Sequence, residues 1–179
     1  NIQQIKRGLT NTIFSFECKG KKYIYRHPGV GTNKIIDRKH EFKAQTIAKE
    51  VGLDPSLIAC NPEKGWKICE YLDNIPFDYD SSDDEARGIA LIREMHSGSK
   101  KKLGWDFNII ERAQEIQNRL SEDYYEAFDH FIELKTKIKQ LYELVSKDGV
   151  EFEMCHNDAC SNNILLGKNR AYLIDWEYA

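Results

Sequence analysis

Three side chains near the C-terminal end of the sequence form a set that could do chemistry: Asp158, Asn163 and Asp175. Two carboxylates and an amide oxygen are ligands that suit Mg²⁺. Phosphoryl transfer needs such a set, with one carboxylate to accept the proton of an alcohol and two residues to hold the metal. Each residue alone is also typical of a turn. The spacing His-x-Asp-x4-Asn from His156, with an aspartate twelve residues after the asparagine, nevertheless favours phosphoryl transfer.

Strand-like patterns surround these residues and would bring them together. Residues 152–155, 163–166 and 171–174 read as strands, and a turn joins the last two. Such a hairpin would place the two carboxylates and the amide at one end of a small sheet. We expect His156 to orient the loop of Asp158 by hydrogen bonding rather than to act as a base.

A second set of residues, near the N-terminus, could bind phosphate. The segment Gly8-Leu9-Thr10-Asn11 lies between two strand-like segments. A glycine lets the backbone approach a phosphate, and Thr10 and Asn11 can hydrogen-bond to it. The same tetrapeptide is also an ordinary hairpin turn. Arg26, near the end of a later strand, and Glu41, in the first long helix, add weight, because kinase-like folds position nucleotide phosphates with a strand cation paired with a helix acid.

The phosphate interpretation leaves two points open. The strand cation is an arginine rather than the usual lysine, which is compatible because a guanidinium binds phosphate bidentately. Glu41 could also lie on a solvated face of its helix, since Arg38, Lys39 and Glu50 show that this helix is rich in charge.

The remaining patterns predict an α+β chain with strands first, helices next and a hairpin last. The first helix is predicted over 34–51, with Gly52 as its C-terminal cap. Ser82 and Glu85 have the spacing of a capping box, which predicts a helix over 83–96 that is apolar on most sides and therefore buried. The other expected strands cover 13–18, 23–26, 57–60 and 66–71, and the other expected helices cover 107–120 and 124–146.

Composition argues against several classes of protein. The chain has 179 residues, with 26 basic and 29 acidic side chains and a net charge of −3, which argues against a general nucleic-acid binder. No apolar run approaches the ~18–20 residues that span a membrane, and the polar N-terminus is not a secretory signal. Five cysteines without a CxxC pair argue against a zinc site or a disulfide framework. We expect reduced thiols in a cytoplasmic protein.

Several segments carry a resemblance to a known family. They cover residues 8–11, 25–32, 35–41, 47–54, 91–96, 156–163 and 173–179. On these segments the chain resembles the choline/ethanolamine kinase family, a branch of the aminoglycoside-phosphotransferase and protein-kinase-like superfamily, and it is most similar to bacterial choline kinases. The superfamily shares His-x-Asp-x4-Asn, whereas Asp-Trp-Glu-Tyr-Ala at 175–179 resembles choline, ethanolamine and thiamine kinases rather than antibiotic kinases.

The resemblance implies a protein-kinase-like fold with two lobes. Residues 1–72 would form the nucleotide-binding N-lobe, built from antiparallel strands and one helix. Residues 73–179 would form a partial, mainly helical C-lobe that carries the catalytic loop and the metal-binding hairpin. The C-lobe would be incomplete, because family members continue well beyond the motif at 175–179.

The resemblance also implies roles for the three chemistry-bearing residues and for the nucleotide contacts. Asp158 would be the catalytic base beside the substrate hydroxyl, and Asn163 and Asp175 would bind Mg²⁺. The residues expected to contact ATP are Thr10 and Asn11 in the phosphate loop, Arg26 paired with Glu41, and the hinge backbone from Glu70 to Leu72.

Tyr178 would begin an aromatic wall that faces the quaternary ammonium of the substrate, since an aromatic face attracts a desolvated cation. Tyr178 follows Glu177 in an expected strand, so the two side chains would point to opposite faces. Glu177 would then support the metal site or the hairpin from the other side.

The implied activity is phosphoryl transfer from ATP to the hydroxyl of a small amino alcohol, choline giving phosphocholine and ADP. The alternatives are the same chemistry on ethanolamine, thiamine or an aminoglycoside, and a non-catalytic nucleotide-binding fragment. Protein kinase activity is disfavoured, because the sequence has neither an Asp-Phe-Gly nor an Ala-Pro-Glu motif. The expected partners are ATP, Mg²⁺ and a small-molecule substrate, without nucleic acid or membrane.

Overall fold

The structure is a computed structural model that describes residues 2–6, 11–98, 103–119, 130–149 and 153–179. The chain divides into two compact units, Asn1–Leu103 with Glu153–Ala179, and Gly104–Phe152. These units are a different division from the predicted lobes, whose boundary at residue 72 stays a prediction.

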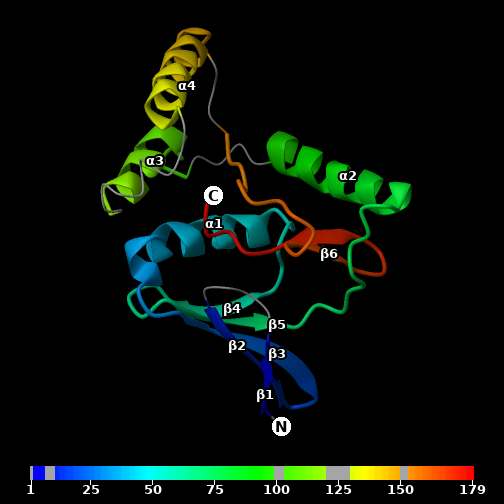
Figure 1. The fold of residues 1–179 in the computed structure, drawn as a ribbon. Helices are drawn as coiled ribbons and strands as arrows, with labels where there is room; N and C mark the ends of the chain where they lie inside the picture. Colours follow the sequence, from blue (N-terminus) through cyan, green and yellow to red (C-terminus); the bar gives the residue numbers. More distant parts are fainter. Residues whose placement is uncertain (1, 7–10, 99–102, 120–129, 150–152) are drawn as a thin grey trace. The chain divides into compact units, whose positions relative to one another are not determined.

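An antiparallel sheet in the order β1-β2-β3-β5-β4 forms the base of the first unit (Figure 1). A tight turn joins β2 to β3, since Lys19 and Gly20 both adopt positive φ (50° and 76°). Because β3 also pairs with β5, Arg26 lies directly opposite Lys67, which places two cations on the same face of the sheet. The strands are β1 (Ile2–Ile5), β2 (Asn11–Cys18), β3 (Lys21–Pro28), β4 (Leu57–Asn61) and β5 (Trp66–Glu70).

Helix α1 (Arg38–Glu50) covers one face of this sheet. It begins later than the predicted residue 34, because the Asp37 carboxylate caps it by accepting hydrogen bonds from two N–H groups of its first turn. The residues before the cap, Thr32–Lys34, form a separate 3-10 turn. Gly52, with φ 81°, follows the helix end as predicted. The buried face of α1 contains Arg38, Glu41, Phe42, Ala44, Gln45, Ile47 and Ala48.

Helix α2 (Ser82–Gly98) begins with a serine cap. The Ser81 hydroxyl accepts a hydrogen bond from the N–H of Asp84 at 3.3 Å, and this is the usual position of an N-cap contact. The predicted capping box of Ser82 and Glu85 is therefore wrong, because the cap lies one residue earlier.

The same helix buries one side only. Leu91 and Met95 are buried, whereas Ile89 is 56% exposed. The prediction that this helix is buried on most sides is therefore wrong, because within the described residues β7 is the element that α2 packs against most closely.

The hairpin of β6 (Ile164–Leu166) and β7 (Ala171–Leu173) forms as predicted. The expected strand over 152–155 does not, since the described residues 153–155 have no strand partner. Met154 is nevertheless buried, so its apolar side chain reflects packing rather than strand pairing. Trp176 is fully buried just after the hairpin and donates a hydrogen bond from Nε1 to the carbonyl of Leu173 at 2.9 Å.

The second unit contains α3 (Ile109–Gln117) and α4 (Phe131–Lys147). Asn108 caps α3, and the Lys135 ammonium of α4 donates to the Gln114 side chain at 2.6 Å. The predicted start of the second helix at 124 lies outside the described residues. Over the described ranges, no helix has the length and apolar character needed to cross a membrane.

Candidate active site

The loop before β6 brings Asp158 and Asn163 into contact. The Asn163 amide Nδ2 donates to the Asp158 carboxylate Oδ2 at 3.0 Å and to the Asp158 backbone carbonyl at 2.9 Å. These two hydrogen bonds use the side-chain nitrogen of Asn163, so its side-chain oxygen Oδ1 is the atom left for a metal. The backbone N–H of Ile174 donates to the backbone carbonyl of Asn163 at 2.9 Å. Ile174 therefore joins the end of β7 to this loop, and Asp175 is the next residue.

His156 is the internal support of the loop. Its Nδ1 accepts a hydrogen bond from the N–H of Asp158 at 3.2 Å, and its Nε2 lies 2.9 Å from the carbonyl oxygen of Ile174. An N–H donor on one nitrogen and a carbonyl acceptor on the other require the neutral ring protonated at Nε2. Burial lowers the pKa of His156, in keeping with that neutral form. The ring also packs edge-on to Trp176, with centroids 4.7 Å apart. These contacts fit an orienting role for His156, because both ring nitrogens are used and neither is available to act as a base.

Two residues of the site have left-handed backbones without being glycines. Asn157 has φ 60° and Asp175 has φ 68°. Asn and Asp tolerate this region better than other residues, although it still costs free energy. The Asn157 amide donates to the carbonyl of Tyr178 at 2.7 Å, which ties the loop to the residues after Asp175.

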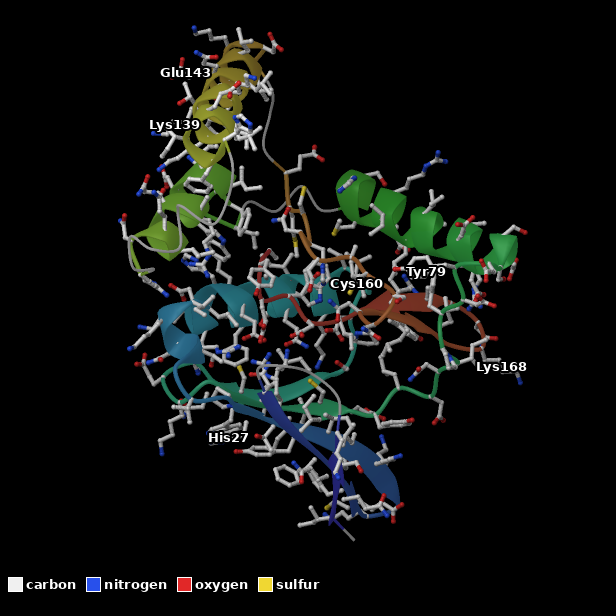
Figure 2. All side chains as sticks on the ribbon, viewed as in Figure 1. His27, Tyr79, Lys139, Glu143, Cys160 and Lys168 are labelled. Atoms are coloured by element: carbon white, nitrogen blue, oxygen red, sulfur yellow. The ribbon has the colours of Figure 1, made fainter. Side chains whose placement is uncertain are left out.

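The segment that precedes α2 also touches the loop. The hydroxyl of Tyr79 accepts a hydrogen bond from the N–H of Ser161 at 3.0 Å. Figure 2 shows Tyr79 near Cys160. The loop between Asp158 and Asn163 is therefore held from both sides.

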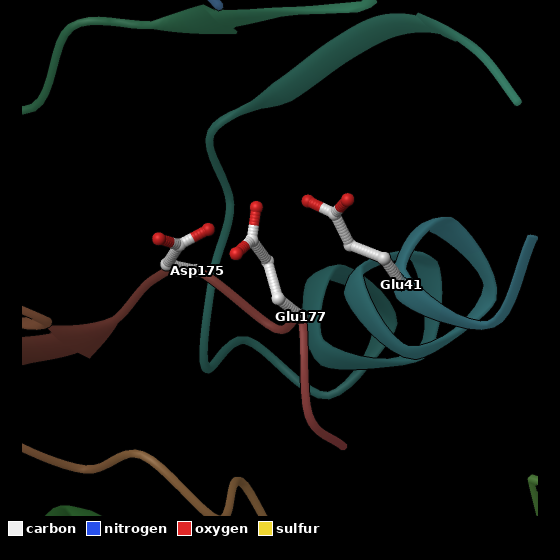
Figure 3. Close-up of side chains that lie close together, drawn as sticks. All are labelled: Glu41, Asp175 and Glu177. Carbon is white, nitrogen blue, oxygen red and sulfur yellow. The ribbon is translucent and has the colours of Figure 1, made fainter. Parts of the chain in front are cut away.

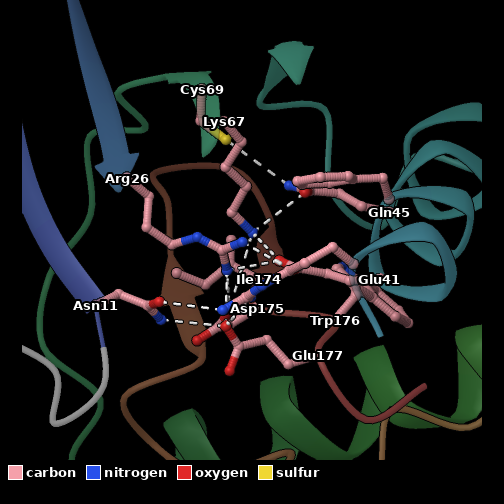
Figure 4. Close-up of polar contacts among 12 residues, drawn as sticks. Asn11, Arg26, Glu41, Gln45, Lys67, Cys69, Ile174, Asp175, Trp176 and Glu177 are labelled. Atoms are coloured by element: carbon pink, nitrogen blue, oxygen red, sulfur yellow. Dashed lines mark hydrogen bonds and ion pairs between the residues drawn. The ribbon is translucent and has the colours of Figure 1, made fainter. Parts of the chain in front are cut away.

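A network of buried charges lies between the sheet and α1 (Figure 4). The Glu41 carboxylate is its centre, with no exposed side-chain surface. Arg26 donates to Glu41 at 2.6–2.7 Å, Arg38 at 2.7 Å and Lys67 at 2.9 Å. The expected pair of Arg26 and Glu41 is thus present, and the alternative of a solvated Glu41 is wrong because three cations surround it.

Glu177 extends the network to the C-terminal segment. Its Oε1 accepts from Arg26 and from Arg38, both at 2.8 Å, and from the Asn11 amide at 3.1 Å. Asn11 begins β2, so the network joins β2 and β3 to α1 and to the segment after β7.

Lys67 brings a third cation from β5. Its ammonium contacts Glu41 and lies 3.8 Å from Oδ1 of Asp175, and its side chain is only 8% exposed. Burial and the neighbouring Arg26 lower the pKa of Lys67, but the charges of Glu41 and Asp175 outweigh them and raise it. Lys67 is therefore a charged ammonium.

The charges decide the state of Glu41 as well. Burial alone would raise the pKa of Glu41, but the charge of Lys67 and the hydrogen bond from Arg26 lower it to about 2. A buried carboxylate with such partners is ionised at every physiological pH.

Glu41, Asp175 and Glu177 each bring one oxygen within 4.8 Å of the others (Figure 3), a spacing that could hold a metal ion. Arg26 and Arg38 already neutralise the two glutamates, which are 0% and 7% exposed. Asp175 is 37% exposed. It is therefore the carboxylate of this trio that can reach a metal, and Asn163 offers a second oxygen nearby in the fold.

The end of β5 leads into the predicted hinge. The N–H of Glu70 donates to the carbonyl of Ser56 at 2.7 Å. Within the described residues, the N–H of Leu72 has no hydrogen-bond partner, so it is a donor that a nucleotide base could use.

Thr10 lies outside the described residues. Tyr178 lies in a turn after β7 rather than in a strand, so the predicted strand alternation of Glu177 and Tyr178 is wrong. The left-handed Asp175 ends the extended backbone before these residues are reached. The Glu177 side chain points to Arg26 and Arg38, as Figure 4 shows for Arg26.

Lys67 and Arg38 are the site residues that the sequence patterns did not identify. Arg38 had a usable signal, since it precedes Glu41 by three positions and therefore shares its helix face. The sequence signal for Lys67 was weaker: it is a charged residue in a short strand that is otherwise largely apolar. Its partners depend on the pairing of β3 with β5, which no local pattern specifies.

Comparison with known proteins agrees with this architecture. The family model described as choline/ethanolamine kinase matches residues 2–179. Protein LicA of Haemophilus influenzae is 24% identical over 178 residues, covering 96% of this chain and 52% of LicA. The crystal structure of choline kinase LicA from Streptococcus pneumoniae superposes with a TM-score of 0.81 at 26% identity, covering 99% of this chain and 63% of that one. A structure of LicA in complex with AMP gives a TM-score of 0.77 at 24% identity, also covering 99% and 63%. The chain thus spans roughly half to two thirds of these relatives, and its fold is kinase-like.

The buried network gives a prediction for acid stability. Glu41→Gln should lower the free energy of unfolding at pH 7 by about 3–5 kcal/mol, because it leaves buried cations without their carboxylate. A carboxylate whose pKa is depressed in the folded state stabilises the fold above its unfolded pKa of 4.5, and this stabilisation is lost as the pH falls towards about 2. Urea unfolding of parent and variant at pH 7, 4 and 3 should therefore show a difference that shrinks with acid.

The matched control is Glu63→Gln, which removes a carboxylate from an exposed pair with Lys39 and should change stability by less than about 1 kcal/mol. A Glu41→Gln difference that is the same at pH 7 and pH 3 would contradict the charged network.

Proposed function

Because the chain belongs to the choline/ethanolamine kinase family, we propose that it transfers the γ-phosphoryl group of ATP to the hydroxyl of a small amino alcohol, with choline as the substrate and phosphocholine as the product. The contact between Asp158 and Asn163, together with the hydrogen bond from the Ile174 N–H to the Asn163 backbone carbonyl just before Asp175, is the observation that supports this proposal.

Asp158 is the proposed catalytic base. Its side chain is exposed, so an alcohol can reach it. Its backbone N–H is fixed by His156 and its Oδ2 by Asn163, so the other carboxylate oxygen is the one presented to a hydroxyl. A carboxylate held in this way accepts the proton of the alcohol as the oxygen attacks phosphorus.

Asp175 and Asn163 are the proposed metal ligands. The donor set fits Mg²⁺, since both offer hard oxygens and Asp175 is accessible. When bound, Mg²⁺ neutralises charge on the phosphate oxygens. Arg26, which lies 3.3 Å from Asp175, is the proposed contact to the same phosphates.

ATP is the proposed phosphoryl donor. The N–H of Leu72, which has no partner among the residues that the structure describes, suits an adenine edge, and residues 70–72 are the proposed hinge. Thr10 and Asn11 are the proposed phosphate-loop residues. The AMP held in a solved structure of LicA supports an adenine nucleotide.

Choline is favoured over ethanolamine by the similarity to choline kinase LicA, at 26% identity, and by Tyr178 as the proposed aromatic wall. The family itself includes both activities by its description, so ethanolamine is the second candidate.

The cysteines of the described residues are free thiols, which supports a cytoplasmic location.

Asp158→Asn should reduce turnover by about 10²–10⁴-fold, because an amide cannot accept the alcohol proton. Binding of ATP should change little, since the shape of the side chain is kept. Steady-state turnover of the protein, with ATP binding measured by calorimetry, tests both parts. Turnover close to that of the parent would refute Asp158 as the base.

Asp175→Ala and Asn163→Ala should each weaken the response to Mg²⁺·ATP. The aspartate should matter more, because a carboxylate holds Mg²⁺ more strongly than an amide does, and excess Mg²⁺ should restore part of the Asn163→Ala activity. The measurement is turnover as a function of Mg²⁺ at fixed ATP. Identical Mg²⁺ curves for parent and variants would exclude a metal role.

Tyr178→Ala should raise the KM for choline several-fold and leave kcat less affected, because one cation–π contact is worth about 0.5–2 kcal/mol. Steady-state kinetics with choline and with ethanolamine provide the measurement, and choline should be the better substrate of the parent. An unchanged choline KM, or faster turnover with ethanolamine, would reject choline while leaving the kinase proposal intact.

A further inference from the structure

A buried chain of hydrogen bonds runs from the loop after α1 to the Lys67 ammonium. The fully buried Asp54 carboxylate accepts from the Ser56 N–H at 3.0 Å, from the Ser56 hydroxyl at 2.5 Å and from the Gln45 Nε2 at 2.8 Å. The Gln45 carbonyl oxygen in turn accepts from Lys67 at 3.2 Å. Figure 4 shows Gln45 extending from α1 to Lys67.

The orientation of the Gln45 amide is fixed by its two neighbours. An Asp54 carboxylate can only accept a hydrogen bond and a Lys67 ammonium can only donate one. The amide nitrogen must therefore face Asp54 and the amide oxygen must face Lys67. The loop that carries Asp54 is itself anchored, because the carbonyl of Leu53 accepts from the N–H of Leu173, two residues before Asp175.

Lys67 has three donor hydrogens and three neighbours at unequal distances. Glu41 lies at 2.9 Å and Gln45 at 3.2 Å, whereas Asp175 lies at 3.8 Å, beyond hydrogen-bond range. The first two contacts draw the ammonium towards α1 and away from Asp175.

We propose that Gln45 is a positioning residue that holds the Lys67 ammonium back from Asp175 and so keeps this carboxylate available to a divalent cation. The inference rests on the proposed role of Asp175 as a metal ligand. Without the Gln45 oxygen, the ammonium keeps Glu41 and closes on Asp175, and a metal must then break a direct ion pair. Without Lys67, this competitor is absent.

The test is a pair of variants with opposite expected signs. Gln45→Met keeps the volume and the net charge, and it should raise the Mg²⁺ concentration for half-maximal binding by several-fold to about tenfold, since Coulomb energy changes steeply over one ångström. Lys67→Met should lower that concentration, because it removes the cation that competes for Asp175. The double variant should behave like Lys67→Met. The readout is the thermal midpoint titrated with Mg²⁺ at saturating ADP, checked by Mn²⁺ binding in electron paramagnetic resonance.

Lys64→Met is the matched control, since Lys64 is an exposed lysine in the turn before β5 and should not move the titration. A loss of packing alone would lower the midpoint of both variants without opposite metal shifts. Equal shifts, or no shift in Gln45→Met, would overturn the inference while leaving the metal site in place. A parent whose midpoint does not respond to Mg²⁺ and ADP would overturn the metal assignment itself, and this inference with it.

Discussion

The enclosure of one carboxylate by three cations is the constraint on which the rest of the site depends. Glu41 has no exposed side-chain surface and is bonded by Arg26, Arg38 and Lys67. A buried charge without partners would be very costly, so the positions of β3, β5 and α1 are coupled through this group. Glu177 joins the segment after β7 to the same network, because its carboxylate pairs with both Arg26 and Arg38.

The loop of Asp158 is built on a different principle. Its support is the neutral ring of His156, which links the Asp158 N–H to the Ile174 carbonyl and packs on buried Trp176. Hydrogen bonds and packing hold this loop, whereas ion pairs hold the side of the site that contains Arg26 and Glu41. The two meet at Asp175, which follows Ile174 and also lies 3.3 Å from Arg26. Asp175, with its left-handed backbone, is thus the residue at which the hydrogen-bonded loop and the charged network join.

Local signals predicted much of this arrangement and failed where distant pairing decides. The hairpin over β6 and β7 follows from period and turn residues, whereas the pairing of Arg26 with Glu41 rests on the resemblance to kinase-like folds. The end of α1 was visible at Gly52, but its start depends on which acidic or polar residue caps it, and the Asp37 cap shortens the predicted helix. Lys67 could not be assigned, because its place opposite Arg26 requires β5 to pair with β3 across the intervening α1 and β4.

The charge balance of the network bears on how the site would accept a nucleotide under the proposed function. The ion pairs of the network join three cations, Arg26, Arg38 and Lys67, to three carboxylates, Glu41, Asp175 and Glu177, so their charges balance. Two of the carboxylates are buried and fully bonded, whereas Asp175 is partly exposed and has the longest contacts. Asp175 is thus the partner that the cations release most easily. A divalent cation that takes Asp175 frees positive charge on Arg26 for phosphate, so the metal and the triphosphate should each favour binding of the other.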